Sequence, residues 1–157
     1  QLAAYLFQRP GEIVGMRWAN VDLDAALWTY QVSKVGLAHA VPLPQQAVDI
    51  LRGIGTVGRD FVFPSKSNTG HVTTANGIKF LKKLGWKDRQ TVHGFRAVAR
   101  TLIAEDLKVE PRLIEQQLSH GVAEAHGRAY NRTLFLDERR HMMQRYADHL
   151  DVLREAC

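Results

Sequence analysis

Apolar positions recur along most of the chain at the three- and four-residue spacing of a helix that buries one face. The opening stretch QLAAYLF belongs to such a helix, and Pro10 suits the first turn of a second one over residues 12–18. The same spacing predicts further helices over residues 44–54, 74–84, 93–106, 111–118 and 137–155. We expect Thr74 to cap the 74–84 helix and Gly85 to end it. The pattern therefore predicts a mainly helical chain.

Three short segments rich in Val, Leu, Trp and Tyr interrupt the helical pattern, at residues 19–24, 27–32 and 39–44. They predict a small antiparallel sheet, with Lys34, Val35 and Gly36 in the turn between its last two strands. The stretch VGRDFVFPSKSNTGH at residues 57–71 predicts an exposed connection. The predicted fold class is mainly α with a small antiparallel three-stranded β-sheet (α+β).

Composition narrows the class of protein. With 157 residues, 45% of them hydrophobic and 24% charged, the chain suits one packed domain. Its 21 Lys plus Arg exceed its 16 Asp plus Glu, so a net charge of +5 favours a polyanionic partner, nucleic acid first. The single cysteine excludes a disulfide framework. No apolar run approaches the roughly 18–20 residues that cross a bilayer, so we expect no membrane association and a cytoplasmic location.

The sequence contains no clear metal-binding or nucleotide-binding motif. The histidines at positions 39, 71, 126, 141 and 149 form no HExxH, and no cysteine pair accompanies them. The stretch GTVGRD lacks the lysine and serine of a phosphate-binding loop. We therefore expect no metal and no cofactor.

Several candidate residues also have ordinary structural explanations when taken singly. His93 and Arg96 share one face of a helix, which spacing alone requires. Arg9 lies at a corner where it could pair with Glu12, and His120 could satisfy the last carbonyls of a helix. Tyr130, between small and basic residues in RAYNR, is off any apolar stripe. Their significance depends on whether they share one site.

Taken in order, these motifs resemble a known family. The stretches RPGE, KVGLAHAVPL, HGFR, LSH and AYNR are similar, in this order, to the first arginine, the lysine hairpin, the His-x-x-Arg box, the second histidine and the nucleophile of tyrosine recombinases, the phage-type integrases. The tail LDERRHMMQRYADHLD resembles integrases of prophages and genomic islands. The chain departs from the family at Ser119, where many relatives have glycine, and at Val35, where a small polar or basic residue is commoner.

The resemblance implies a function and a site. Residues 1–157 would be the single C-terminal catalytic domain of a longer integrase, with the N-terminal DNA-binding domains outside this chain. The implied activity is site-specific DNA recombination, for integration or excision of a mobile element, through a 3′-phosphotyrosyl intermediate. The implied catalytic residues are Arg9, Lys34, His93, Arg96, His120 and Tyr130. The implied partner is double-stranded DNA, bound by a homo-tetramer that exchanges tail segments from residues 136–157, with room for accessory DNA-bending proteins. The isolated fragment would be a bacterial, cytoplasmic monomer.

The residue types suit this chemistry. Attack on a phosphodiester places negative charge on non-bridging oxygens, which the planar guanidiniums of Arg9 and Arg96 can bind through paired donors. A phenol with a pKa of about 10 is only about 0.1% ionised at pH 7, so Tyr130 needs a proton acceptor. His93 and His120 both suit that role, and the sequence does not separate them. By the resemblance, Lys34 protonates the departing 5′ hydroxyl.

The sequence leaves two other functions open. A type IB topoisomerase uses similar residues to nick and reseal one strand, and a catalytically inactive basic module would only bind DNA. Supercoil relaxation by a monomer would favour the topoisomerase. Unchanged activity after Tyr130→Phe would favour the inactive module.

Overall fold

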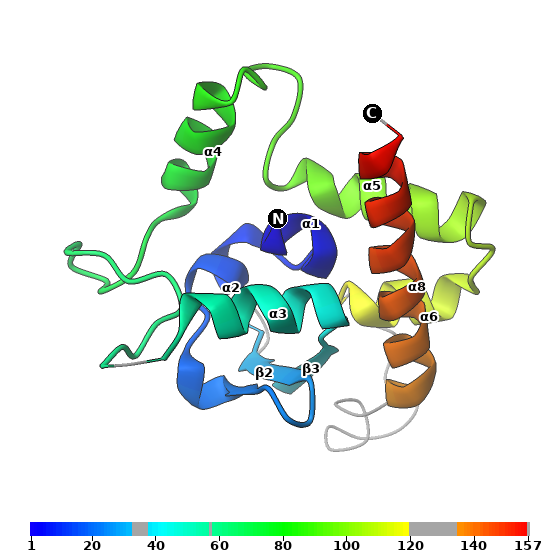
Figure 1. Ribbon diagram of the computed structural model, residues 1–157, viewed down its shortest axis with the longest axis horizontal. Helices are drawn as coiled ribbons and strands as arrows, with labels where there is room; N and C mark the ends of the chain where they lie inside the picture. The colour runs from blue at the N-terminus through cyan, green and yellow to red at the C-terminus, as the bar shows by residue number, and fades with distance from the viewer. Residues whose placement is uncertain (33–37, 57, 120–134, 157) are drawn as a thin grey trace.

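The structure, a computed structural model, describes residues 1–32, 38–56, 58–119 and 135–156. In these residues the chain is mainly helical, and one three-stranded antiparallel sheet lies at an edge of the helices, which confirms the predicted fold class (Figure 1). The elements are α1 Leu2–Leu6, α2 Pro10–Val14, a 3₁₀ turn Trp18–Asn20, β1 Val21–Asp22, β2 Leu27–Gln31, β3 Ala38–Pro42, α3 Gln45–Ile54, α4 Thr74–Lys83, α5 Gly94–Glu105, α6 Pro111–Gln117 and α8 Leu136–Glu155.

The sheet has the strand order β1-β2-β3, with Trp28 opposite both Val21 and Val41. Side chains alternate along β2, so Trp28 and Tyr30 are buried on one face. β3 is buried along nearly its whole length, because α8 packs against it. The sheet therefore contributes one face to the core, and Tyr30 and His39 point into it from paired positions.

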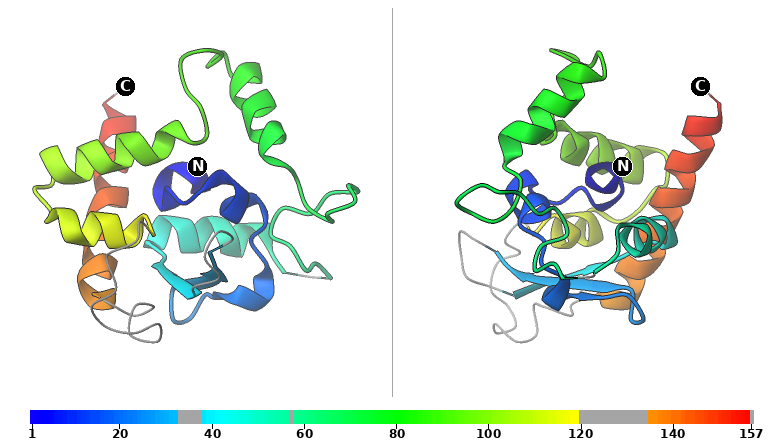
Figure 2. Two further views of the ribbon diagram at one scale, coloured as in Figure 1. Left: turned by 180° about the vertical axis from the view of Figure 1, so that it is seen from behind. Right: turned by 60° about the vertical axis from the view of Figure 1, so that its left-hand side comes forward.

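Helix α8 packs on the body of the same chain. It contacts α1, α5, α6 and β3, and it lies along one side of the molecule (Figures 1 and 2). Its buried residues follow the i, i+3, i+4, i+7, i+8 spacing of a helix with one apolar face. They are Arg139, Met142, Met143, Tyr146 and Ala147. The predicted amphipathic tail is thus confirmed, and it is packed in cis.

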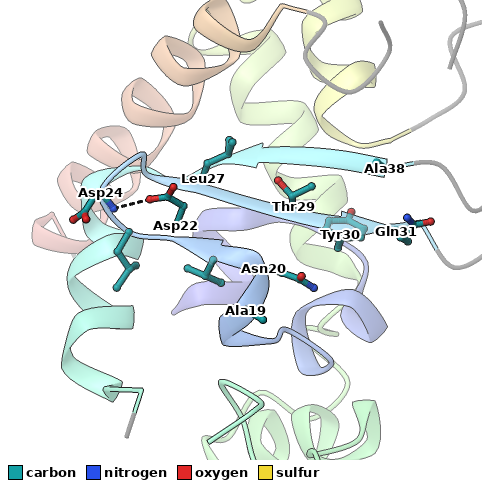
Figure 3. A pocket seen from close by; sticks show the side chains of 11 residues that line it. Ala19, Asn20, Asp22, Asp24, Leu27, Thr29, Tyr30, Gln31 and Ala38 are labelled. Carbon is teal, nitrogen blue, oxygen red and sulfur yellow. Dashed lines mark hydrogen bonds between the residues drawn. The ribbon is translucent and has the colours of Figure 1, made fainter. Parts of the chain in front are cut away.

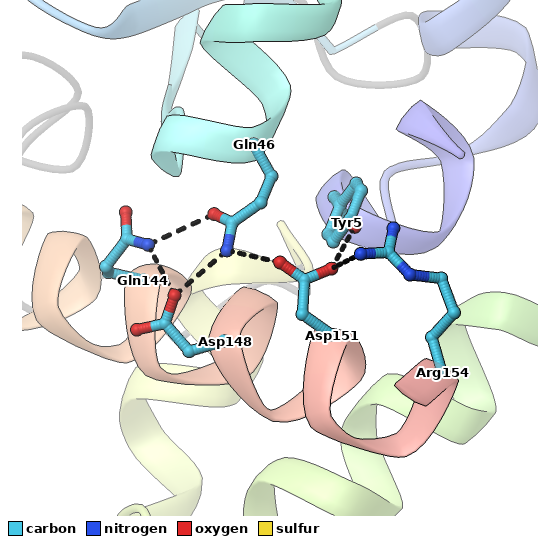
Figure 4. Close-up of polar contacts among 6 residues, drawn as sticks. All are labelled: Tyr5, Gln46, Gln144, Asp148, Asp151 and Arg154. Atoms are coloured by element: carbon cyan, nitrogen blue, oxygen red, sulfur yellow. Dashed lines mark hydrogen bonds and ion pairs between the residues drawn. The ribbon is translucent and has the colours of Figure 1, made fainter. Parts of the chain in front are cut away.

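Polar contacts hold the outer part of α8 against α1 and α3 (Figure 4). The hydroxyl of Tyr5 donates to Asp151 Oδ1 at 2.6 Å. Gln46 Nε2 donates to Asp148 Oδ1 and to Asp151 Oδ2, both at 2.9 Å. Arg154 Nη2 lies 3.3 Å from Asp151 Oδ1. Apart from Tyr5, which is buried, these side chains are more exposed than the apolar stripe, so burial of the stripe supplies most of the stability of this packing.

Helix α4 stands apart from the body in all three views (Figures 1 and 2). None of its residues is buried, and Ile78, Phe80 and Leu84 are each more than half exposed. The predicted cap was wrong by one residue. Thr73 is the N-cap, and its backbone N–H donates to Asn76 Oδ1 at 3.0 Å. Gly85, with φ of 82°, follows the helix end as predicted.

Two other predictions need correction. The second helix covers Pro10–Val14 and ends at Gly15, short of the predicted Trp18, which instead begins a 3₁₀ turn. The 57–71 connection is not wholly exposed, since Val62 is buried and a β-bridge pairs Phe61 with Arg17. The turn predicted at residues 34–36 lies outside the described residues.

Candidate active site

Arg9 occupies the corner between α1 and α2. It is the N-cap of α2, with extended backbone angles, and Pro10 follows at the first helical position. Its side chain reaches the end of α6, where Nη2 donates to the carbonyl oxygen of Ser119 at 3.3 Å. The other terminal nitrogen, Nη1, is buried and has no hydrogen-bond partner in the part of the chain that the structure describes. A buried donor without a partner is costly, so this atom has an unmet hydrogen bond that a ligand oxygen would satisfy.

Arg96 is carried into the interior by α5. It lies on the same buried face as Ala99 and Ile103. Its Nη1 donates to the carbonyl of Phe7 at 2.9 Å, and its Nη2 donates to the carbonyl of Leu118 at 2.8 Å. Phe7 and Leu118 are the C-cap residues of α1 and α6, whose carbonyls have no helical partner. One guanidinium therefore ties two helix ends together.

The structure thus brings Arg9 and Arg96 to two consecutive carbonyls, those of Ser119 and Leu118. Burial and then the nearby positive charge of Arg9 lower the pKa of Arg96. Two cations held this close repel each other, and an anion between them would relieve the repulsion. Chemically, the pair can bind an oxyanion such as a phosphate.

His93 has a different setting from the two arginines. It is the exposed N-cap of α5, and its backbone carbonyl accepts a hydrogen bond from the Arg96 amide at 3.0 Å. Its imidazole makes no hydrogen bond with any described residue. The other predicted site residues, Lys34, His120 and Tyr130, lie outside the described residues. Ser119 directly precedes His120 in the sequence.

Next to the arginine pair lies a buried polar network that the sequence analysis missed. Its members are Gln8, Tyr30, His39, Gln117 and Arg139, all less than a tenth exposed. For two of these residues, the position in the sequence could have indicated a role near the site. Gln8 directly precedes Arg9, and Arg139 occupies an apolar-stripe position of α8 three residues before Met142. A polar residue on a buried face indicates a specific partner.

The network lies in a strongly positive environment. Burial, and then the charges of Arg139, Arg9 and Arg96, lower the pKa of His39 to about 3, while the carbonyl of Gln117 opposes this shift. Burial also lowers the pKa of Arg139 to about 10. Burial and then the charge of Glu12 raise the pKa of the Tyr30 phenol. His39 and Tyr30 therefore stay uncharged beside three guanidiniums.

The structure has two hollows that are not lined by the predicted site residues Arg9, His93 and Arg96. One, of about 780 Å³, lies under the sheet between the 3₁₀ turn and β3 (Figure 3). There Asp22 Oδ1 accepts hydrogen bonds from the backbone N–H groups of Asp24 and Ala25 at 3.1 and 2.7 Å. The other hollow, of about 800 Å³, separates α4 from α2 and α3 and is lined mainly by apolar side chains. Arg9, His93 and Arg96 line neither.

Membrane-spanning helices and metal-binding clusters are both absent from the described residues. None of the helices there is long and apolar enough to cross a membrane. In the same residues, no group of three or more His, Cys, Asp or Glu side chains comes together in a way that could hold a metal ion.

Comparison with known proteins places the chain in a family. Residues 1–137 match the model of the phage integrase family. Prophage integrase IntZ of Escherichia coli K12 is 35% identical over 149 residues, which is 92% of this chain and 37% of IntZ. The integrase of Enterobacteria phage P4 is 32% identical over 98% of this chain and 40% of its own length. The chain thus spans less than half the length of these relatives.

Solved structures share the fold at lower sequence identity. The integrase from mycobacterium phage Brujita superposes with a TM-score of 0.73 at 20% identity, over 92% of this chain and 49% of its own. A lambda integrase dimer bound to a COC′ core site gives a TM-score of 0.58 at 16% identity, over 80% of this chain and 51% of that one. From the motif order and the match over most of its length, this chain belongs to the phage integrase family.

Proposed function

We propose that this chain catalyses site-specific DNA recombination, cutting and rejoining strands through a 3′-phosphotyrosyl bond at Tyr130. Membership of the phage integrase family supports the reaction class. The observation that carries the proposal for this chain is the convergence of Arg9 and Arg96 on the consecutive carbonyls of Ser119 and Leu118. Neither a solvated corner arginine nor an isolated helix cap requires that convergence.

In this proposal the arginines bind the scissile phosphate. The buried, unpartnered Nη1 of Arg9 binds a non-bridging oxygen, and Arg96 supplies positive charge from a rigid setting. Charge develops on these oxygens in the transition state, and donors fixed in advance stabilise it without reorganisation. Loss of one such donor costs about 100- to 1,000-fold in rate.

The remaining residues of the proposed site transfer protons. The phenol of Tyr130 attacks phosphorus and loses its proton to His93 or His120. The bond from phosphorus to the 5′ oxygen breaks, and Lys34 protonates that oxygen as it leaves. The 3′-phosphotyrosyl ester keeps the bond energy until a 5′ hydroxyl of another strand attacks it and releases Tyr130.

We further infer the setting of this chemistry. Residues 1–157 form the C-terminal catalytic domain of a longer integrase, and other domains of that protein hold the duplex. Double-stranded DNA is the substrate, which is supported by the net charge of +5 and by the fold shared with a lambda integrase dimer bound to a core site. Assembly as a tetramer on DNA belongs to the same proposal.

A covalent trapping experiment tests the function. The full-length integrase is incubated with a duplex that carries its attachment site and a nick beside the scissile phosphate, so that the released fragment diffuses away. We expect a protein–DNA adduct that survives SDS with wild type and none with Tyr130→Phe. Binding without any adduct would overturn the proposal. Relaxation of supercoiled plasmid without an attachment site would instead indicate a topoisomerase.

A further inference from the structure

Gln8 ties the chain just before Arg9 to the end of α6. Its side chain is 1% exposed. Nε2 donates to the carbonyl of Gln117 at 2.9 Å and to that of Leu6 at 3.1 Å, while Oε1 accepts the hydroxyl of Tyr30 at 3.0 Å. The amide thus joins three parts of the chain, so its orientation is fixed from both ends.

Gln117 is the second fixed point, and it directly precedes the two carbonyls that the arginines use. It is fully buried. Its carbonyl accepts hydrogen bonds from Gln8 and from His39 Nε2, the latter at 3.2 Å. Its Oε1 accepts from Arg139 Nη1 at 3.1 Å, and the same nitrogen donates to the carbonyl of Ala40 at 2.9 Å. α8 and β3 therefore both hold the end of α6.

The turn after Gln117 needs such support. Leu118 ends α6, and Ser119 has φ of 52°, in the left-handed region that favours glycine. A non-glycine residue there keeps this conformation only where surrounding contacts impose it. The position of both arginine-binding carbonyls therefore depends on contacts made by neighbouring residues.

His39 suits this setting because it is a neutral donor. Its Nε2 contacts a carbonyl, which only accepts, so Nε2 carries the hydrogen. The imidazole is buried and faces Arg139, Arg9 and Arg96, so protonation would place a fourth positive charge among them. The neutral His39 ring can therefore donate to the carbonyl of Gln117 without adding to the repulsion among these guanidiniums.

We propose that Gln8 and Gln117, fixed by Tyr30 and His39, are positioning residues that hold the carbonyls of Leu118 and Ser119 where Arg9 and Arg96 bind phosphate. This inference rests on the proposed function of the two arginines. None of the four residues touches the phosphate. Their effect passes through the orientation of the guanidiniums, and misplacement by about 1 Å can cost about 100-fold in rate.

Gln8→Met is the main test, because methionine keeps the length of the side chain and removes its hydrogen bonds. Gln46→Met is the matched control, since Gln46 also bridges elements through its amide but contacts only α8 (Figure 4). Adduct formation is timed at saturating nicked duplex, duplex affinity is measured separately, and urea unfolding at the assay temperature shows that each variant is folded. We expect Gln8→Met to slow the adduct step about 10- to 100-fold with affinity within about two-fold, and Gln46→Met to match wild type.

Two further comparisons separate positioning from stability. In an Arg9→Lys background, Gln8→Met should cost less than it does in wild type, because the Arg9 guanidinium that Gln8 helps to position is already absent. His39→Gln, which keeps a donor, should retain more of the rate than His39→Leu. Full additivity with Arg9→Lys, or a wild-type rate for Gln8→Met, would overturn the proposal. If Gln8→Met does not fold, Tyr30→Phe takes its place in these tests, because it removes only the hydroxyl that donates to Gln8. The same criteria then apply to Tyr30→Phe.

The inference can fail separately from the proposed function. If the wild-type integrase forms no adduct, the proposed function fails. The positioning role of Gln8 is then tested by titrating inorganic phosphate into the 157-residue chain. The arginine side-chain NMR signals report the phosphate affinity. We expect Gln8→Met to weaken phosphate binding at least about five-fold, since it displaces one of two charge-assisted contacts. Equal affinities for wild type and Gln8→Met would overturn it.

Discussion

Arg9 and Arg96 donate to the carbonyl oxygens of neighbouring residues, at 3.3 Å to Ser119 and 2.8 Å to Leu118. They reach this point from different elements, the corner before α2 and the buried face of α5. Arg96 has a second buried bond, to Phe7, whereas Arg9 keeps a buried nitrogen without a partner in the described residues. The two arginines therefore differ in how much of the fold depends on them.

Alanine at each arginine should reveal this difference. We expect Arg9→Ala and Arg96→Ala each to lower adduct formation by about 100- to 1,000-fold, because the first removes a donor to the phosphate and the second removes positive charge held beside it. Arg96→Ala loses two hydrogen bonds and should lower the free energy of unfolding by about 1.5–3 kcal/mol for each, while Arg9→Ala loses one longer bond and should cost less than half as much. Urea unfolding measures this, with exposed Arg52→Ala as the control. Equal destabilisation by both changes would contradict the assignment.

Ser119→Gly should stabilise the protein. Ser119 adopts a φ of 52°, where a Cβ atom is strained and glycine is not. We expect the free energy of unfolding to rise by about 0.5–1 kcal/mol. Ser119→Ala keeps the Cβ atom and should give no gain. A loss of stability in the glycine variant would mean that the serine side chain contributes more than its backbone conformation costs.

His39 should make stability fall in mildly acidic solution. Its pKa is about 3 when folded, against about 6.5 when unfolded, so between these values only the unfolded chain binds the proton. The stability is fully present above about pH 6.5 and is lost as the pH falls, with a slope that approaches roughly 1.4 kcal/mol per pH unit. Urea unfolding of wild type and His39→Gln from pH 8 to pH 4 measures this. The difference between them should be constant above about pH 7 and change steadily below, whereas parallel curves would show that His39 does not cause it.

Helix α8 should be required for the stability of the isolated chain. Met143 is fully buried on its inner face, so Met143→Ala leaves a cavity and should cost about 2–5 kcal/mol. Val152, on the same helix, is 62% exposed, and Val152→Ala should change stability by about 0.5 kcal/mol or less. Thermal and urea unfolding compare the two. Similar small effects would mean that α8 is detached in solution.

DNA binding by the 157-residue chain should be weak and sensitive to salt. Its excess of positive charge favours phosphate contacts, which release counterions, so the logarithm of affinity should fall linearly with the logarithm of salt concentration. Fluorescence anisotropy with a labelled duplex between 50 and 200 mM salt measures the slope, where roughly six to ten phosphate contacts would cost about 10³–10⁵ in affinity. Binding independent of salt would contradict a phosphate-dominated contact.

Much of the fold follows from local pattern. The sequence alone determined the helical spacing, the three short strands and the order of motifs from RPGE to AYNR. These features depend on side-chain period and turn residues within a few positions, which is why α3, α5, α6 and α8 match the predicted ranges closely. The burial of Arg96 was not predicted, although Arg96 shares a helix face with Ala99 and Ile103.

Only the tertiary structure decided which distant groups meet. That Arg9 and Arg96 share adjacent carbonyls, and that Gln8, His39 and Arg139 all bond to Gln117, depends on packing between elements far apart in the chain. Periodicity fixes which face of a helix is apolar but not what covers it, as the exposed apolar residues of α4 show. Hydrogen bonds across the core are directional and form only after burial has fixed both partners, so local sequence does not encode them.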